Sequence, residues 1–221
     1  MSIKTKLVTA ATVLTVMAGV GAAGTLTANA ATPKCGAICS DFYSATSGTA
    51  FVLDAPNRVG QAGQPVTLAR ANRASKGEDF VLQVLGTVSD FHAAGFVPAG
   101  LNALYGGLSV YEIEYAPGAS NSFLCLGTAG PPGAGTPVTL EPCGVQAKTL
   151  WIFTQQKTSG GTYDVLISAA TSRNFQHPYV LTTPAPGSPL VTAQLVAGTS
   201  PAFARQLWNW KTGVLPSSLA H

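Results

Sequence analysis

The sequence predicts an all-β domain made of three related copies of one small unit. Two observations favour this fold class. Short apolar strands recur three times in the same order, and a turn rich in Gly and Pro separates the first two strands of each copy. A unit this small buries too little apolar surface to fold alone, so we expect the copies to share one core around a pseudo-threefold axis.

The middle copy, residues 123–153, shows the pattern most clearly. We expect strands at residues 123–126, 137–140 and 150–153, and Trp151 supplies the bulkiest side chain of the third strand. Two consecutive prolines and several glycines exclude regular structure between the first two strands.

Two degraded copies flank the middle one. Each keeps the order of strand, turn and strand, which distinguishes the pattern from chance similarity among strands rich in Val and Leu. The expected strands are residues 51–54, 64–68 and 79–82 in the first copy, and residues 179–182, 189–193 and 206–210 in the third. We expect one domain over residues 47–215, with copies at residues 48–118, 119–175 and 176–215.

The middle copy resembles a ricin-type β-trefoil lectin repeat. That repeat has a Cys-Leu-Asp opening, a Gly-x-x-Val-x-Leu second strand, a second Cys and a closing Gln-x-Trp. This chain supplies Cys125-Leu126, Gly135 to Leu140, Cys143 and Trp151 in the middle copy, Gln206-Leu207-Trp208 in the third, and Leu53-Asp54 in the first. The resemblance covers residues 45–215 and implies a β-trefoil, which is an all-β fold of three pseudo-repeats.

The four cysteines predict two disulfides, for which three connectivities exist. The resemblance implies a Cys125–Cys143 bond, which leaves Cys35 to pair with Cys39. The alternative ties the N-terminal pair to the body through crossed bonds. Cys35 and Cys39 lie far from the histidines in the sequence, so we expect no metal site and no other cofactor.

The first thirty residues predict a secretory signal peptide. Lys4 and Lys6 precede a small apolar stretch at residues 7–24, and Ala28-Asn29-Ala30 offers a cleavage site. A permanent membrane anchor is the alternative. No further apolar run has membrane length, so we expect a secreted, extracellular protein with no membrane contact in its mature form.

The net charge limits the classes of partner that the protein can bind. Without Lys4 and Lys6 the chain keeps ten Lys and Arg against nine Asp and Glu, which is too nearly neutral for nucleic-acid binding. We expect a monomer. Residues 31–46 are expected to form an N-terminal segment with a small Cys loop, in which residues 41–44 close the barrel beside the C-terminus. Residues 216–221 are expected to be a frayed tail.

An insertion interrupts the first copy at residues 89–107. It is expected to be a long loop, and its two Phe and one Tyr predict that it either packs or binds a partner. The copy resumes at residues 108–115, where alternation predicts Tyr111, Ile113 and Tyr115 in the core and Glu112 and Glu114 in solvent.

No catalytic constellation was found, so we expect no enzyme. Glu112 and Glu114 suit acid and base roles in glycoside cleavage, but a solvated strand face is the simpler interpretation. The pair Glu78-Asp79 is interpreted in the same way, as a solvated turn.

The resemblance implies a carbohydrate site in each repeat, built from the Asp after Cys-Leu, an aromatic residue after the second strand, and polar groups near Gln-x-Trp. The first copy keeps Asp54 and offers the amide of Asn72, with Ala69 at the aromatic position and Glu78 at the Gln position. The third copy keeps Gln206 but has Thr182 in place of Asp. The second copy has Gly127 and Thr149 at these positions, so its site is expected to be lost.

The candidate carbohydrate-binding residues are therefore Asp54, Asn72 and Gln206. A structural interpretation stands beside this one, in which Trp151 and Trp208 fill the core and Gln206 bonds to main chain. We expect a secreted, non-catalytic domain that binds a glycan or polysaccharide through degenerate sites. The alternative is a secreted interaction or inhibitor module that captures another secreted protein with its insertion at residues 89–107.

Overall fold

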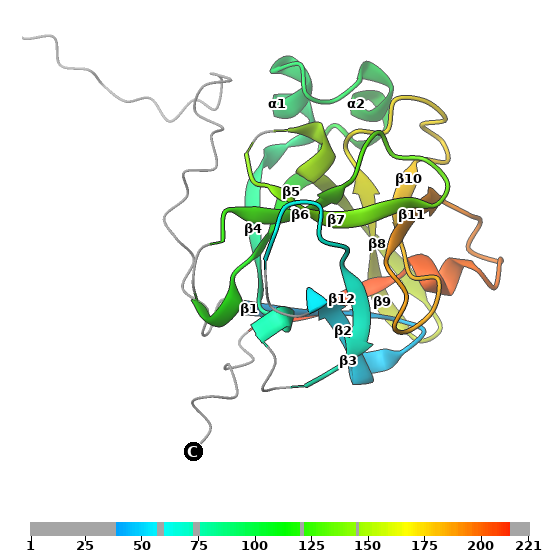
Figure 1. Cartoon of the computed structure of the whole chain (residues 1–221). Coiled ribbons are helices and arrows are strands. Elements are labelled where there is room, and N and C mark those ends of the chain that lie inside the picture. Colours follow the sequence, from blue (N-terminus) through cyan, green and yellow to red (C-terminus); the bar gives the residue numbers. More distant parts are fainter. Residues whose placement is uncertain (1–38, 57–59, 73–75, 120–121, 145, 213–221) are drawn as a thin grey trace, which may run out of the picture.

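The computed structural model has the expected all-β architecture and describes residues 39–56, 60–72, 76–119, 122–144 and 146–212 (Figure 1). The expected signal peptide, Cys35 and the C-terminal tail lie outside these residues. The strands are β1 Cys39–Ser44, β2 Phe51–Asp54, β3 Thr67–Arg70, β4 Phe80–Thr87, β5 Ser109–Tyr115, β6 Leu124–Thr128, β7 Thr136–Pro142, β8 Trp151–Thr158, β9 Gly161–Ser168, β10 Tyr179–Thr182, β11 Val191–Gln194 and β12 Trp208–Thr212.

Six of the strands close into a barrel. Antiparallel pairing runs from β1 to β4, β5, β8, β9 and β12, and β12 returns to β1. The last pairing joins Ser40 to Thr212 and Ser44 to Trp208. The segment at residues 41–44 therefore closes the barrel as expected, and it supplies the fourth strand of the third repeat.

The other six strands form three hairpins, β2–β3, β6–β7 and β10–β11, which cap the barrel. They are joined by a cyclic set of main-chain hydrogen bonds. Val66 N–H donates to Val138 O at 3.0 Å, Val138 N–H donates to Leu190 O at 2.9 Å, and Leu190 N–H donates to Val66 O at 2.8 Å. Each repeat thus gives and receives the same bond, which confirms the pseudo-threefold β-trefoil.

The interior of the barrel and cap holds one large apolar cluster. Alternation along the barrel strands directs Ile113, Tyr115 and Trp151 inward, where all three are fully buried. The indoles of Trp151 and Trp208 each donate Nε1–H to a main-chain oxygen, of Leu126 at 2.8 Å and of Leu181 at 3.0 Å. These two Trp residues occupy the structural role that the sequence suggests.

The insertion in the first repeat forms two short helices instead of a loop. They are α1 Val88–Ala93 and α2 Ala99–Tyr105, and they lie beside each other outside the barrel (Figure 1). A capping box at Thr87 begins α1, in which Asp90 N–H donates to Thr87 Oγ1 at 3.2 Å and Asp90 Oδ2 accepts from Thr87 N–H at 2.9 Å.

The helices bury the outer wall of the barrel. Residues that alternate with the inward set on β5, β8 and β9, such as Val110, Ile152 and Val165, form a second apolar cluster with Phe91 and Leu101 of the helices. All five are fully buried. The insertion therefore packs, and its apolar side chains are largely withdrawn from solvent.

Truncating Leu101 to Ala should lower the free energy of unfolding by about 3 kcal/mol, because it leaves a cavity in this second cluster. Leu104→Ala on the same helix removes a side chain that is 43% exposed and should change it by less than about 0.5 kcal/mol. Urea denaturation of both variants measures the difference. Equal losses would show that the helices do not form part of the core.

Candidate functional site

The three repeats place three equivalent positions where the cap meets the barrel. The first is the residue that follows the buried Leu of the opening strand. The second is a main-chain N–H two residues beyond the second strand. The third is the residue two before the core aromatic of the third strand. In chain order these positions are Asp54, Asn72 and Glu78, then Gly127, Gly144 and Thr149, then Thr182, Val196 and Gln206.

In the third repeat, Gln206 fastens the loop that follows β11. Its Oε1 accepts from Val196 N–H at 3.0 Å, and its Nε2 donates to Gln194 O at 2.8 Å. The residue is only 2% exposed. Both ends of the amide are therefore engaged with main chain, as the structural interpretation expects, and the side chain presents no surface to a ligand.

In the first repeat, Glu78 takes the place of this glutamine. Its Oε1 accepts from Asn72 N–H at 2.7 Å, which matches the bond from Gln206 to Val196. Glu78 is buried, so the prediction of a solvated turn is wrong for this residue. Burial raises the pKa of its carboxyl to about 7, and the nearby charges of Asp54, Asp41 and Asp79 add to the rise.

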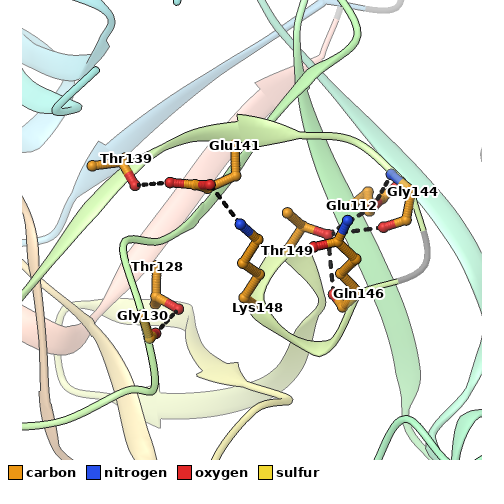
Figure 2. Close-up of polar contacts among 9 residues, drawn as sticks. All are labelled: Glu112, Thr128, Gly130, Thr139, Glu141, Gly144, Gln146, Lys148 and Thr149. Carbon is orange, nitrogen blue, oxygen red and sulfur yellow. Dashed lines mark hydrogen bonds and ion pairs between the residues drawn. The ribbon is translucent and has the colours of Figure 1, made fainter. Parts of the chain in front are cut away.

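In the second repeat, the Thr149 hydroxyl reaches the loop, with Gly144 O and Gln146 O each at 3.1 Å, and a carboxylate from another strand accepts the loop N–H. Glu112 of β5 accepts from Gly144 N–H at 3.2 Å and from Thr149 Oγ1 at 3.0 Å (Figure 2). Glu112 is buried, so the prediction that it lies in solvent is wrong. The same loop N–H is thus satisfied in all three repeats, by three different side chains.

Glu114, the neighbour of Glu112 on the same face of β5, is buried as well, which also contradicts the prediction of a solvated face. Its Oε2 accepts from Gln83 Nε2 at 2.5 Å. Burial raises the pKa of Glu114 to about 7, and the charge of Glu112 contributes to the rise. The β5 face carries this pair beside Cys125, which pairs with Glu114 across β5 and β6 and forms a disulfide with Cys143.

The disulfide predicted between Cys125 and Cys143 is present. Cys39 is also disulfide-bonded, and the predicted partner Cys35 lies outside the described residues. Among the described residues, no cluster of three His, Cys, Asp or Glu side chains is arranged to hold a metal ion. Within the same part of the chain, none of the helices has both the length and the apolar character to span a membrane.

The first repeat brings together two of the three candidate binding residues. Asp54 ends β2, is half-buried and lies against Gly77, where an added Cβ would come within 2.3 Å of Asp54 Oδ1. Asn72 is exposed, and its main chain is held by Glu78. Asp54 and Asn72 therefore flank one buried carboxyl, whereas Gln206 belongs to the third repeat.

In the second repeat, an internal ion pair between Glu141 and Lys148 occupies the place of the candidate carbohydrate site. Glu141 of β7 crosses over Gly127, where a Cβ would lie 2.9 Å from Glu141 Cγ. The Glu141 carboxylate accepts from Thr139 Oγ1 at 2.7 Å and from Lys148 Nζ at 2.6 Å (Figure 2). Gly127 is thus required by the side chain that now fills its space, which gives a physical reason for the missing Asp.

Sequence reasoning missed the roles of Glu78 and Glu112. The spacing of Glu78, two residues before Phe80, matches that of Gln206 before Trp208 and is a signal that could have identified its bond to the loop. Glu112 lies far from Gly144 in the chain, so no local spacing identifies it.

The fold and this arrangement of repeats define a β-trefoil protein. The structure is similar to the designed threefold-symmetric protein ThreeFoil, with a TM-score of 0.53 and 14% identity over 78% of this chain and 96% of that chain. Agglutinins from Rhizoctonia solani and Abrus precatorius are also similar, with TM-scores of 0.47 and 0.44 and identities of 12% and 16%. They are matched over 94% and 48% of their chains and over 78% and 79% of this one. No family model and no curated protein sequence matches the chain.

Replacing Glu78 with Gln should stabilise the protein at pH 8 and have little effect below about pH 4.5. The folded state holds the Glu78 proton more tightly than the unfolded chain, because the carboxyl pKa rises from 4.5 to about 7. The resulting stabilisation is complete below pH 4.5 and is lost as pH rises to about 7. Gln keeps the acceptor for Asn72 N–H without a buried charge.

The expected gain at pH 8 is on the order of 1 kcal/mol, after allowance for solvent screening. Thermal unfolding at pH 4 and pH 8 measures it. Gln206→Glu is the reverse exchange at the equivalent position and should destabilise at pH 8. A Glu78→Gln variant less stable than the parent at pH 8 would contradict the assignment.

Gly127→Asp should lower the free energy of unfolding by about 2 kcal/mol, because the new side chain collides with Glu141 and with Lys148 O. Gly130→Asp is the matched control, since a Cβ there meets nothing within 4 Å. The double change Gly127→Asp with Glu141→Ala should recover part of the loss. Chemical denaturation compares the three variants, and equal effects at positions 127 and 130 would refute the collision.

Proposed function

We propose that the protein is a secreted, non-catalytic module that binds carbohydrate through its first repeat. Asp54 accepts hydrogen bonds from sugar hydroxyls, and the amide of Asn72 both donates and accepts. The observation that carries the proposal is the comparison of equivalent positions. Only the first repeat has a carboxylate after the buried Leu, whereas Gly127 and Thr182 stand there in the other two.

The geometry around Asp54 supports a prepared site. Glu78 holds the Asn72 main chain at 2.7 Å, and because its pKa is raised to about 7 it is mostly protonated at mildly acidic pH. A protonated Glu78 adds no second negative charge beside Asp54. The main chain at Asn72 is therefore held by Glu78 before a ligand arrives, which lowers the entropic cost of binding.

We propose that the protein is not catalytic because its acidic pair, Glu112 and Glu114, is buried. Glu112 and Glu114 are 1% and 4% exposed, and Glu112 is engaged by Gly144 and Thr149. A glycosidic bond cannot approach carboxyls in that position, so they serve the fold. Secretion is supported by the signal-like residues 1–30 and by the Cys125–Cys143 disulfide, which is typical of an oxidising compartment.

The alternative of protein capture by residues 89–107 loses its main support. That hypothesis rested on a long loop with two Phe and one Tyr, and the segment instead forms two helices whose Phe91 and Leu101 are buried against the barrel wall. The carbohydrate proposal is therefore the better supported of the two.

Asp54→Ala should weaken glycan binding about ten- to a hundredfold, because it removes hydrogen bonds to a charged acceptor. Calorimetric titration with a glycan chosen from an array screen measures the loss. Thr182→Ala, at the equivalent position of the third repeat, is the control and should change the affinity little. Undiminished binding by Asp54→Ala would exclude this site, and the absence of binding to every glycan would exclude the function.

A further inference from the structure

A cavity of about 260 Å³ lies apart from the site around Asp54. It sits at the seam between the second and third repeats, where the end of β8 meets the loops on either side of the β10–β11 hairpin. Its lining residues are Gln156, Gln176, His177, Leu195, Val196, Ala197, Gly198 and Phe203. Thr182, the counterpart of Asp54 in this repeat, does not line it.

The lining combines an apolar floor with a polar rim. Leu195, Val196 and Phe203 are members of the second apolar cluster or pack against it, and they give the cavity an aromatic wall. Gln156, Gln176 and His177 bring two carboxamides and an imidazole to the same opening. A few convergent polar groups over an apolar floor are the usual composition of a small-ligand site.

Both walls are fixed by hydrogen bonds. On one side, His177 N–H donates to Asn174 O at 2.7 Å, and His177 Nδ1 is bonded to Leu195 O at 3.2 Å. Because Nδ1 faces this carbonyl, it carries the hydrogen of the neutral ring, which leaves Nε2 as an acceptor. On the other side, Gln206 holds Val196 N–H at 3.0 Å. The opening is therefore preorganised for a ligand.

The chemistry of the lining selects a class of ligand. None of the eight described residues that line the cavity carries a carboxylate, an ammonium or a guanidinium group. An anion thus finds no carboxylate-pairing cation such as Lys or Arg, and His177 belongs to no described cluster of three His, Cys, Asp or Glu that could hold a metal ion. A ring with one apolar face and several hydroxyls satisfies both parts of the lining, because its face packs on Phe203 while its hydroxyls pair with the amides.

We propose that this cavity is a second binding site, specific for a neutral pyranose. It shares its ligand class with the proposed function but uses none of the same residues. The two sites lie in different repeats, so one polysaccharide chain or two glycan branches can engage both, and their affinities then combine through effective concentration.

The test is titration of the full chain with methyl α-mannopyranoside, methyl β-glucopyranoside and methyl β-galactopyranoside, followed by protein-observed NMR. The experiment compares four proteins. They are the parent, the single variant Asp54→Ala, and two double variants that combine Asp54→Ala with Gln156→Ala or with Gln176→Ala. In the Asp54→Ala background, at least one glycoside should still bind, and each Gln change should weaken that binding about tenfold. Gln155→Ala is the matched control, because Gln155 is the exposed neighbour of Gln156 on β8 and does not line the cavity.

The outcomes separate the two proposals. Glycoside binding by the parent that Asp54→Ala abolishes overturns the second site and leaves the first in place. Binding that is unaffected by Asp54→Ala and lost on changing Gln156 or Gln176 supports the second site and excludes the first. Residual binding that Gln155→Ala weakens as much as Gln156→Ala does, or the absence of binding to all three glycosides, overturns the assignment of this cavity.

Discussion

Three main-chain hydrogen bonds between Val66, Val138 and Leu190 join the hairpins of the cap into a ring. Each residue is both donor and acceptor, so no hairpin can shift register without breaking two of the bonds. The apolar side chains of the same three residues are fully buried in the shared core. The position of each repeat is thus fixed by the other two, and the loops at the junction of cap and barrel inherit that positioning.

At the junction of cap and barrel, the same main-chain hydrogen bond is made in all three repeats, although the side chain that accepts it differs. The loop N–H of Asn72, Gly144 or Val196 takes part in a partly buried hydrogen bond in each repeat, and a buried donor left unpaired costs about 1–3 kcal/mol. Glu78, Glu112 and Gln206 supply the acceptor in turn, the second of them from a different strand. Residues at and near the Gln-x-Trp position therefore serve the fold, and the proposed carbohydrate site is assigned instead to Asp54 and Asn72.

Local pattern was sufficient to predict the strands, the three repeats and the barrel-closing segment, and the resemblance to a ricin-type repeat supplied the Cys125–Cys143 disulfide. It failed where burial depends on chain far away in sequence. Glu112 alternates correctly with Ile113 on β5, but the loop at Gly144 and Thr149 covers the outward face. Likewise, the residues at 89–107 look like a binding loop until the second apolar face of β5, β8 and β9 is known. Alternation gives the two faces of a strand, and it does not say that both are covered.

The pairing of β1 with β12 places the first and last strands of the described fold side by side, with Ser40 opposite Thr212. The strand contacts of the barrel therefore do not depend on which repeat comes first in the sequence. A short peptide joining these neighbouring ends, with a new break at a surface turn between two repeats, gives a permuted sequence with the same set of strand contacts. The third repeat is therefore built from two separate segments, β10 to β12 at the end of the described fold and β1 at its beginning.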